Sequence, residues 1–186
     1  MAQTHKIVLT GGPGTGKTTV MHELEHRGYN CFSEISRQVI LEARTLGIDQ
    51  LFLNDPLLFS QKLIQSRQRQ YNEAGKQAAE KVFLDRGVHD VIAYMHYAEA
   101  DYPPSFAETC RQCRYDTVFL FPPWEAIYVS DNERYEDFGQ ARAIHNFIKS
   151  AYIAYGHHPV EVPTGTVKDR ADFILHTCGN HSPGMM

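Results

Sequence analysis

The sequence predicts an α/β fold built on a five-stranded parallel sheet with helices on both faces. Two observations lead to this prediction: short apolar segments alternate with helical segments five times along the 186 residues, and a glycine-rich turn directly follows the first apolar segment. A strand that returns parallel to its neighbour needs a crossover, so this alternation is typical of a doubly wound sheet. The length predicts one domain over residues 1–178, followed by a disordered tail over residues 179–186.

The glycine-rich turn at residues 11–18 reads Gly-Gly-Pro-Gly-Thr-Gly-Lys-Thr and follows an expected strand at residues 6–10. It matches the phosphate-binding loop, in which glycines let successive N–H groups point at phosphate oxygens where a helix begins. Lys17 is expected to reach the β- and γ-phosphates, and the Thr18 hydroxyl is expected to bind Mg²⁺. The sequence therefore predicts a P-loop NTPase with these nucleotide contacts: Gly11, Gly12, Pro13, Gly14, Thr15, Gly16, Lys17, Thr18 and Thr19.

The segments that follow the loop have recognisable ends. A helix over residues 17–27 ends before Gly28, because glycine favours the left-handed conformation at a helix C-terminus. A short strand is expected at residues 29–35. A second helix is expected at residues 37–46 and is ended by Gly47.

A long amphipathic helix is expected over residues 56–80. Asn54 or Asp55 caps it, and Pro56 lies in its first turn, where the missing N–H has no cost. The apolar spacing predicts a buried side that consists of Leu57, Phe59, Leu63, Ile64 and Tyr71.

The second half of the chain continues the alternation. Strands are expected at residues 81–84, 115–121 and 159–162. Helices are expected at residues 88–100, 138–155 and 167–177, and a short helix carries Cys110 and Cys113.

Ligands of such sheets bind outside the carboxyl ends of the strands. This rule brings together segments that are far apart in the sequence, namely residues 11–19, 34–37, 85–87, 122–124 and 163–166. We therefore expect the functional site along this edge of the sheet.

Asp85 and Arg86 end the apolar strand that is expected to flank the phosphate-binding strand. A phosphoryl-transfer site needs Mg²⁺ and cations around the phosphates. Asp85 is therefore predicted to complete the metal shell, with the capping of the helix at residues 88–100 as the alternative. Arg86 is predicted either to bind the substrate or to pair with a neighbouring acid.

Glu34 and Arg37 follow the second strand. Glu34 lies where a kinase holds the acceptor hydroxyl or its general base. Its alternative role is an ion pair with Arg37, and Arg37 is itself predicted to bind an acidic group of the acceptor.

Arg134 and Arg142 are predicted to act in catalysis from a lid that closes over the transferred phosphate, with solvent exposure as the alternative for each. Together with Lys17, Glu34 and Asp85 they complete the predicted catalytic set. Trp124 is expected either to stack on a base or to belong to the core.

Composition narrows the partners. A formal net charge of −4 and a pI near 6.2 lack the basic character of nucleic-acid binders, so no nucleic-acid partner is expected.

The N-terminus has no signal-peptide pattern and no apolar run is long enough to span a bilayer, so we expect a cytoplasmic protein without a stable membrane anchor. Four cysteines fit reduced thiols, and the Cys110–Cys113 pair has no second pair at zinc-finger spacing. Nothing in the sequence indicates the oligomeric state.

Five motifs together support a family resemblance. They are the loop at residues 11–19, Ser-Glu-Ile-Ser-Arg at 33–37, Asp-Arg-Gly at 85–87, Phe-Pro-Pro-Trp at 121–124 and the segment at 162–170. Over nearly the whole chain they resemble the small AAA-type predicted ATPase family of P-loop proteins, which is related to the nicotinamide riboside kinase domain. More distantly, they resemble deoxynucleoside kinases. The resemblance implies a nucleoside-kinase-like fold, with Glu34 as the base and with Asp85 and Arg86 as the metal and substrate residues.

Other features of the family patterns bear on the nucleotide. Residues 164–168 resemble the segment that contacts adenine in nucleotide kinases, which implies ATP as the donor and Thr164 and Gly165 as contacts. The chain has neither the Asn-Lys-x-Asp motif of guanine selection nor the apolar run ending in Asp-Glu of motor-type AAA ATPases. The expected lid departs from the arginine-rich lids of typical kinases because it is acidic, with Asp131, Glu133, Glu136 and Asp137.

Three functions follow from these observations. The leading interpretation is a kinase that uses ATP and Mg²⁺ to phosphorylate a small hydroxyl compound such as a nucleoside or nicotinamide riboside. Glu34 favours it, because a switch needs no acceptor base. The alternatives are a switch that binds ATP or GTP and signals to a lipid or protein partner through loop ordering, and a slow ATPase that acts with a partner. The acidic lid favours these two.

Overall fold

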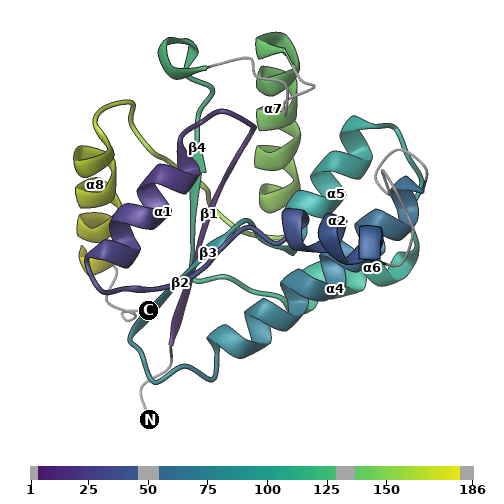
Figure 1. The fold of residues 1–186 in the computed structure, drawn as a ribbon, viewed down its shortest axis with the longest axis horizontal. Helices are drawn as coiled ribbons and strands as arrows, with labels where there is room; N and C mark the ends of the chain where they lie inside the picture. Colours follow the sequence, from purple (N-terminus) through teal and green to yellow (C-terminus); the bar gives the residue numbers. More distant parts are fainter. Residues whose placement is uncertain (1–3, 46–54, 129–136, 181–186) are drawn as a thin grey trace.

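The computed structural model describes residues 4–45, 55–128 and 137–180 and shows an α/β fold (Figure 1). Five parallel strands form one sheet in the order β2-β3-β1-β4-β5. The strands are β1 (His5–Gly11), β2 (Asn30–Phe32), β3 (Lys81–Asp85), β4 (Thr117–Phe121) and β5 (Val160–Glu161). The predicted parallel sheet is confirmed.

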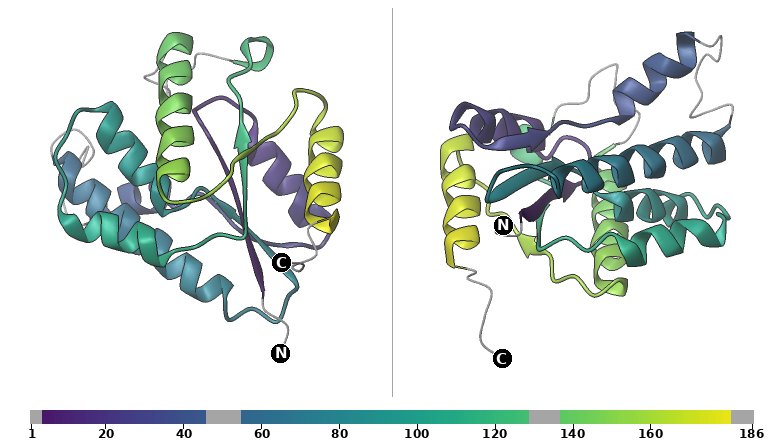
Figure 2. Two further views of the ribbon diagram at one scale, coloured as in Figure 1. Left: turned by 180° about the vertical axis from the view of Figure 1, so that it is seen from behind. Right: turned by 90° about the horizontal axis from the view of Figure 1, so that it is seen from below.

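Helices cover both faces of the sheet, as predicted (Figures 1 and 2). The two helices α1 and α8 lie on one face, and α4, α5 and α7 lie on the other. Along the central strand, Ile7 and Leu9 pack toward the first group while Val8 packs toward the second, which is the two-residue alternation of a strand buried on both faces. The helices are α1 (Lys17–His26), α2 (Ser36–Thr45), α4 (Pro56–Ala74), α5 (Val88–Tyr97), α6 (Pro104–Gln112), the 3₁₀ turn η1 (Glu125–Ile127), α7 (Phe138–Ala154) and α8 (Val167–Asn180).

The register of the strands aligns the carboxyl ends of β3, β1 and β4. Leu9 pairs with Asp85 on one side of β1, and Gly11 pairs with Phe121 on the other. The phosphate-binding loop therefore begins beside the end of β3, as expected from the apolar run at residues 82–84. The predicted site segments meet at this edge.

Two elements are shorter than predicted. The strand expected at residues 29–35 is limited to β2, because Glu34 turns its carboxylate back onto the N–H groups of Ile35 and Ser36 and starts α2. The helix expected at residues 56–80 ends at Ala74, where Gly75 forms the C-cap.

The predicted start of α4 is confirmed, but its predicted buried side is partly wrong. The Asp55 side chain caps the helix by accepting a hydrogen bond from the Leu58 N–H at 2.9 Å. Leu63 and Ile64 are buried, whereas Leu57 is 39% exposed because the first turn extends beyond the core.

Several predicted boundaries lie at or beyond the ends of the described segments. Helix α8 continues to Asn180, two residues into the segment expected to form the tail. Gly47, Asn54, Asp131, Glu133 and Glu136, together with residues 181–186, lie outside the described residues.

The described residues form neither a membrane-spanning helix nor a cluster of metal ligands. None of their helices combines the length and apolar character needed to cross a membrane. They also contain no group of three His, Cys, Asp or Glu side chains arranged around a common metal position. All four cysteines are free, and burial raises the pKa of Cys113 to about 11, which disfavours its reactive thiolate form.

Candidate functional site

The phosphate-binding loop owes its shape to two glycines with backbone conformations that larger residues rarely adopt. Gly16 has a φ of 79°, and a Cβ atom there would lie 2.7 Å from the Arg170 guanidinium. Gly11 has a φ of 146°, and a Cβ atom there would lie 2.5 Å from the Phe121 carbonyl oxygen. The loop is therefore held tightly between β4 and α8, with its turn open toward the edge of the sheet.

Lys17 is buried at the start of α1 and its ammonium group closes the loop. Nζ donates to the carbonyl oxygens of Gly11 at 3.0 Å and Gly12 at 2.8 Å. Burial lowers the pKa of Lys17 to about 7, with a further contribution from Arg86. Phosphate oxygens would offer this ammonium a better partner than neutral carbonyls, because hydrogen bonds between ionised groups are stronger.

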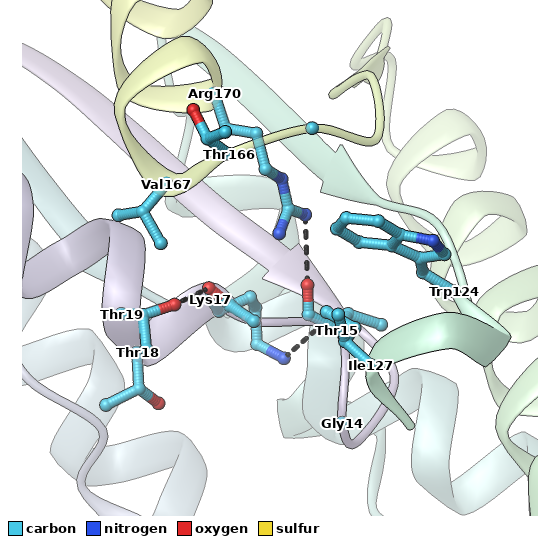
Figure 3. A pocket seen from close by; sticks show the side chains of 12 residues that line it. Gly14, Thr15, Lys17, Thr18, Thr19, Trp124, Ile127, Thr166, Val167 and Arg170 are labelled. Carbon is cyan, nitrogen blue, oxygen red and sulfur yellow. Dashed lines mark hydrogen bonds between the residues drawn. The ribbon is translucent and has the colours of Figure 1, made fainter. Parts of the chain in front are cut away.

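A cavity of about 490 Å³ extends from the loop to the start of α8 (Figure 3). Its floor consists of the loop and the first turn of α1. Trp124 and Val167 lie at its sides, and Arg170 reaches down from α8 to the Thr15 carbonyl (Figure 3). This size and mixture of apolar and polar walls suit a nucleotide.

A second cavity, of about 370 Å³, adjoins the first at Gly14, Lys17 and Thr18. It runs toward the ends of β2 and β3. Its polar lining consists of Lys17, Thr18, His22, Ser33, Glu34, Ser36, Asp85 and Arg86. Seven of the predicted site residues therefore line one space: Pro13, Gly14, Lys17, Thr18, Glu34, Asp85 and Arg86.

Glu34 is held by two arginines and two backbone N–H groups. Oε1 accepts from Arg67 at 3.1 Å as well as from Ile35 and Ser36, and Oε2 accepts from Arg86 Nε at 2.6 Å. Burial by itself would raise the pKa of Glu34, but the charges of Arg67 and Arg86 outweigh burial and lower it to about 2. The carboxylate is thus ionised and fixed in orientation.

Arg86 adopts a left-handed backbone conformation, with a φ of 70°, that turns its side chain into the site. Its guanidinium also pairs with Asp90 Oδ1 at 3.1 Å. Asp90 is fully buried and accepts from Thr10 at 2.5 Å, from the Gly87 N–H at 3.0 Å and from Tyr152 at 2.8 Å. A non-glycine residue at positive φ is strained, and this network offsets the strain.

Asp85 fits a role near a metal ion. It is buried, and its Oδ1 atom has no hydrogen-bond donor. Burial raises the pKa of Asp85, which Lys17 opposes. A carboxylate oxygen without a partner in a cavity that also contains the exposed Thr18 hydroxyl suits Mg²⁺ or one of its waters.

A family model described as an AAA domain matches residues 6–170. The chain belongs to this AAA domain family. The family resemblance expected from the sequence is confirmed. Curated protein sequences give no match.

Solved structures show where this AAA domain belongs among P-loop folds. The NadR protein in complex with NR superposes with a TM-score of 0.70 at 18% identity, over 98% of this chain and 52% of that one, so the AAA domain spans about half of NadR. Deoxyadenosine kinase from M. mycoides, with the products dCMP and a flexible dCDP bound, gives a TM-score of 0.66 at 15% identity, over 94% and 98% of the two chains. These similarities confirm the predicted nucleoside-kinase-like fold.

The remaining predicted residues of the AAA domain differ in whether they line the cavity that contains Lys17. Arg142 is exposed on α7 and lines a third cavity, of about 400 Å³, which Trp124 also lines. Gly165 lines the nucleotide cavity, whereas Thr164 is exposed and is not among its lining residues. Arg134 and the side chain of Arg37 lie outside the described residues, so their roles stay predictions.

Three buried residues of the site were not predicted from the sequence: Arg67, Asp90 and Arg170. Arg67 did leave a signal, because it stands four residues after Leu63 on the buried stripe of α4. A charged residue on such a stripe needs a buried partner. The sequence signal for Asp90 is weaker, because an acidic residue in the first turn of α5 resembles an ordinary capping residue.

The predicted metal role of Asp85 implies a specific defect in a variant that lacks its charge. Asp85→Asn keeps the shape but removes the charge, so the Mg²⁺ concentration that gives half-maximal nucleotide binding is expected to rise about 10-fold or more. The measurement is a Mg²⁺ titration of nucleotide affinity. Asp101→Asn, in the exposed connection between α5 and α6, is the control and is expected to match the parent. An Asp85→Asn titration that overlays the parent would reject the role.

Proposed function

We propose that the protein is a kinase that transfers the γ-phosphate of ATP to a hydroxyl group of a small acceptor, a nucleoside or a compound like nicotinamide riboside. One observation carries the proposal: the nucleotide cavity and the cavity with Glu34, Asp85 and Arg86 meet at Lys17 and Thr18. A nucleotide switch needs the first cavity alone. The similarity to solved structures of NadR with NR and of deoxyadenosine kinase supports the choice of acceptor.

Each residue of the site has a place in the proposed reaction. Lys17 and the loop hold the β- and γ-phosphates, and Thr18 and Asp85 hold Mg²⁺, which offsets the phosphate charge when bound. Arg86, already oriented by Asp90, faces the transferred group. Glu34 has its orientation fixed by Arg67 and Arg86, and it accepts a hydrogen bond from the acceptor hydroxyl.

The transfer forms a bond between the acceptor oxygen and the γ-phosphorus while the bond to the β–γ bridging oxygen breaks and ADP leaves. The hydroxyl proton passes to the Glu34 carboxylate and then to water. A carboxylate with a pKa of about 2 is a weak base. It suffices because the transition state of phosphoryl transfer is loose, so the oxygen loses its proton late, when it is already acidic.

The organisation that we propose is a single domain that binds ATP and Mg²⁺ and needs no nucleic acid. The free cysteines, which form no disulfide, support a cytoplasmic location.

The decisive experiment measures ADP release and phosphorylated product by mass spectrometry. ATP and Mg²⁺ are supplied with a panel of nucleosides, nicotinamide riboside and other small hydroxyl compounds. We expect one class of compound to gain a phosphate. Glu34→Gln is expected to lower this transfer by about 10²- to 10⁴-fold, the usual contribution of a positioned acid or base, while ATP affinity stays near that of the parent.

Glu161→Gln is the matched control, because this glutamate is exposed and pairs with Lys149 away from the cavities. It is expected to retain full transfer. A Glu34→Gln variant with full transfer would discard Glu34 as the acceptor residue. Slow ADP release that no compound of the panel changes would instead favour the switch or the partner-dependent ATPase.

A further inference from the structure

Trp124 does not belong to the core. It follows β4 at the edge of the sheet, is only half-buried, and lines the nucleotide cavity opposite Val167 (Figure 3). Ile127, on the same segment, packs on the loop, with its Cδ1 atom 3.3 Å from the position of a Cβ at Gly16. The indole is therefore part of the cavity wall and is placed against the phosphate-binding loop.

Arg170 fixes the position of this wall. Its side chain is almost fully buried, and NH2 donates to the Thr15 carbonyl at 2.9 Å. Its guanidinium carbon lies 4.5 Å from the centre of the Phe121 ring and 5.8 Å from the centre of the Trp124 ring. The second distance is close to the limit of about 6 Å for a cation–π contact, so the guanidinium orients the indole without covering it closely.

Arg170 thus contacts both the phosphate-binding loop and the indole of Trp124. Lys17 and the loop N–H groups form the floor of the cavity, and Trp124 and Val167 form apolar walls on opposite sides of it (Figure 3). A nucleotide whose phosphates lie on the loop has to place its base among these apolar walls. A flat aromatic ring gains most there by stacking.

We propose that Trp124 stacks on the purine ring of the donor nucleotide and that Arg170 is the positioning residue that holds Trp124 and the loop in register. The inference rests on the proposed nucleotide binding and adds to it the residue that recognises the base. Stacking on an aromatic side chain tolerates different bases, so ATP and GTP both gain from Trp124.

The chain contains a single tryptophan, so its fluorescence reports on this residue alone. The protein is titrated with ATP, GTP and inorganic triphosphate, each with Mg²⁺. We expect ATP and GTP to quench the emission and triphosphate to leave it nearly unchanged. Binding of all three ligands is measured in parallel by calorimetry, which does not depend on the tryptophan or on catalysis.

Variants then separate base binding from phosphate binding. Trp124→Ala is expected to lower the affinity for ATP by about tenfold and to leave the affinity for triphosphate unchanged. Tenfold lies within the range of about 5- to 150-fold that stacking of one base gives. Trp124→Phe retains a ring and is expected to recover most of the loss. Arg170→Met is expected to lower the affinities for both ATP and triphosphate, because the Thr15 carbonyl loses its donor. The loss of affinity is expected to be larger for ATP.

The outcomes distinguish this inference from the proposed function. If triphosphate binds as tightly as ATP, or if Trp124→Ala lowers the affinities for both ligands equally, the proposed stacking of Trp124 on the base is wrong. The phosphate site is unaffected by that result. If Arg170→Met weakens ATP no more than triphosphate, Arg170 has no role in base recognition. If neither ligand binds the parent protein, both the inference and the proposed function fail.

Discussion

Lys17→Met is expected to lower nucleotide turnover by at least about 10²- to 10³-fold, the cost of removing one electrostatic donor to a developing charge. The ammonium of Lys17 lies where the two cavities meet, and no other cation among the described residues donates to the carbonyls of Gly11 and Gly12. This loss is expected for a kinase, a switch and an ATPase alike. The measurement is ADP release at saturating ATP and Mg²⁺.

The same variant is expected to fold at least as stably as the parent at pH 6. The pKa of Lys17 is lowered to about 7, so the folded state disfavours its protonated form relative to the unfolded chain. Between pH 7 and the ordinary lysine pKa of about 10.4, the unfolded chain binds more protons, and the stability of the parent rises with pH. The advantage of Lys17→Met is therefore expected to shrink as the pH rises from about 7 toward 10.

Urea denaturation at pH 6 and pH 9 tests this expectation. Lys149→Met is the control, because Lys149 pairs with Glu161 on the surface, and its stability and turnover are expected to stay close to those of the parent. A Lys17→Met protein that is clearly less stable than the parent at pH 6 would show that the lost turnover reflects folding and not chemistry.

Asp90→Ala is expected to lower the free energy of unfolding by about 3–5 kcal/mol, the cost of breaking a buried ion pair by removing one partner. Asp90 accepts hydrogen bonds from Thr10, Arg86, Gly87 and Tyr152 and is fully buried. Alanine would leave these donors unpaired and would release Arg86 on one side. Urea denaturation at pH 7 measures the loss.

The effect of Asp90→Ala is expected to depend on pH. Burial by itself would raise the pKa of Asp90, but Arg86 and Arg67 outweigh burial and lower it. The stabilisation by Asp90 is thus complete above the unfolded pKa of about 3.9 and is lost as the pH falls through the lower folded value. The difference in the free energy of unfolding between the parent and Asp90→Ala is therefore expected to become smaller in strong acid.

Two further variants complete this test. Asp101→Ala removes an exposed carboxylate and is expected to stay within about 0.5 kcal/mol of the parent. Asp90→Asn keeps the shape of the side chain and one acceptor oxygen. Its free energy of unfolding is therefore expected to lie between those of the parent and Asp90→Ala. A loss below about 1 kcal/mol for Asp90→Ala, the net value of a single ordinary hydrogen bond, would contradict the buried network.

The fold and the phosphate loop could be predicted because local patterns determine them. The pattern at residues 11–18 specifies a turn that only glycine allows and a lysine that starts a helix. Residues 82–84 of the strand are all apolar, which predicted its burial beside β1 and the position of Asp85. The predicted lengths of β2 and α4 were wrong. The Glu34 carboxylate and Gly75 end these elements through contacts that secondary-structure propensity does not show.

The sequence by itself determined the sheet, the loop, and the edge at which Glu34, Asp85 and Arg86 meet. Only the tertiary structure decided what these side chains contact. It brought Arg67 from α4 to Glu34, Asp90 to Arg86, and Arg170 from the last helix to the loop. The reason is physical: spacing along a chain fixes which face of an element a residue occupies, whereas a buried charge selects its partner from whatever the packed helices bring within reach.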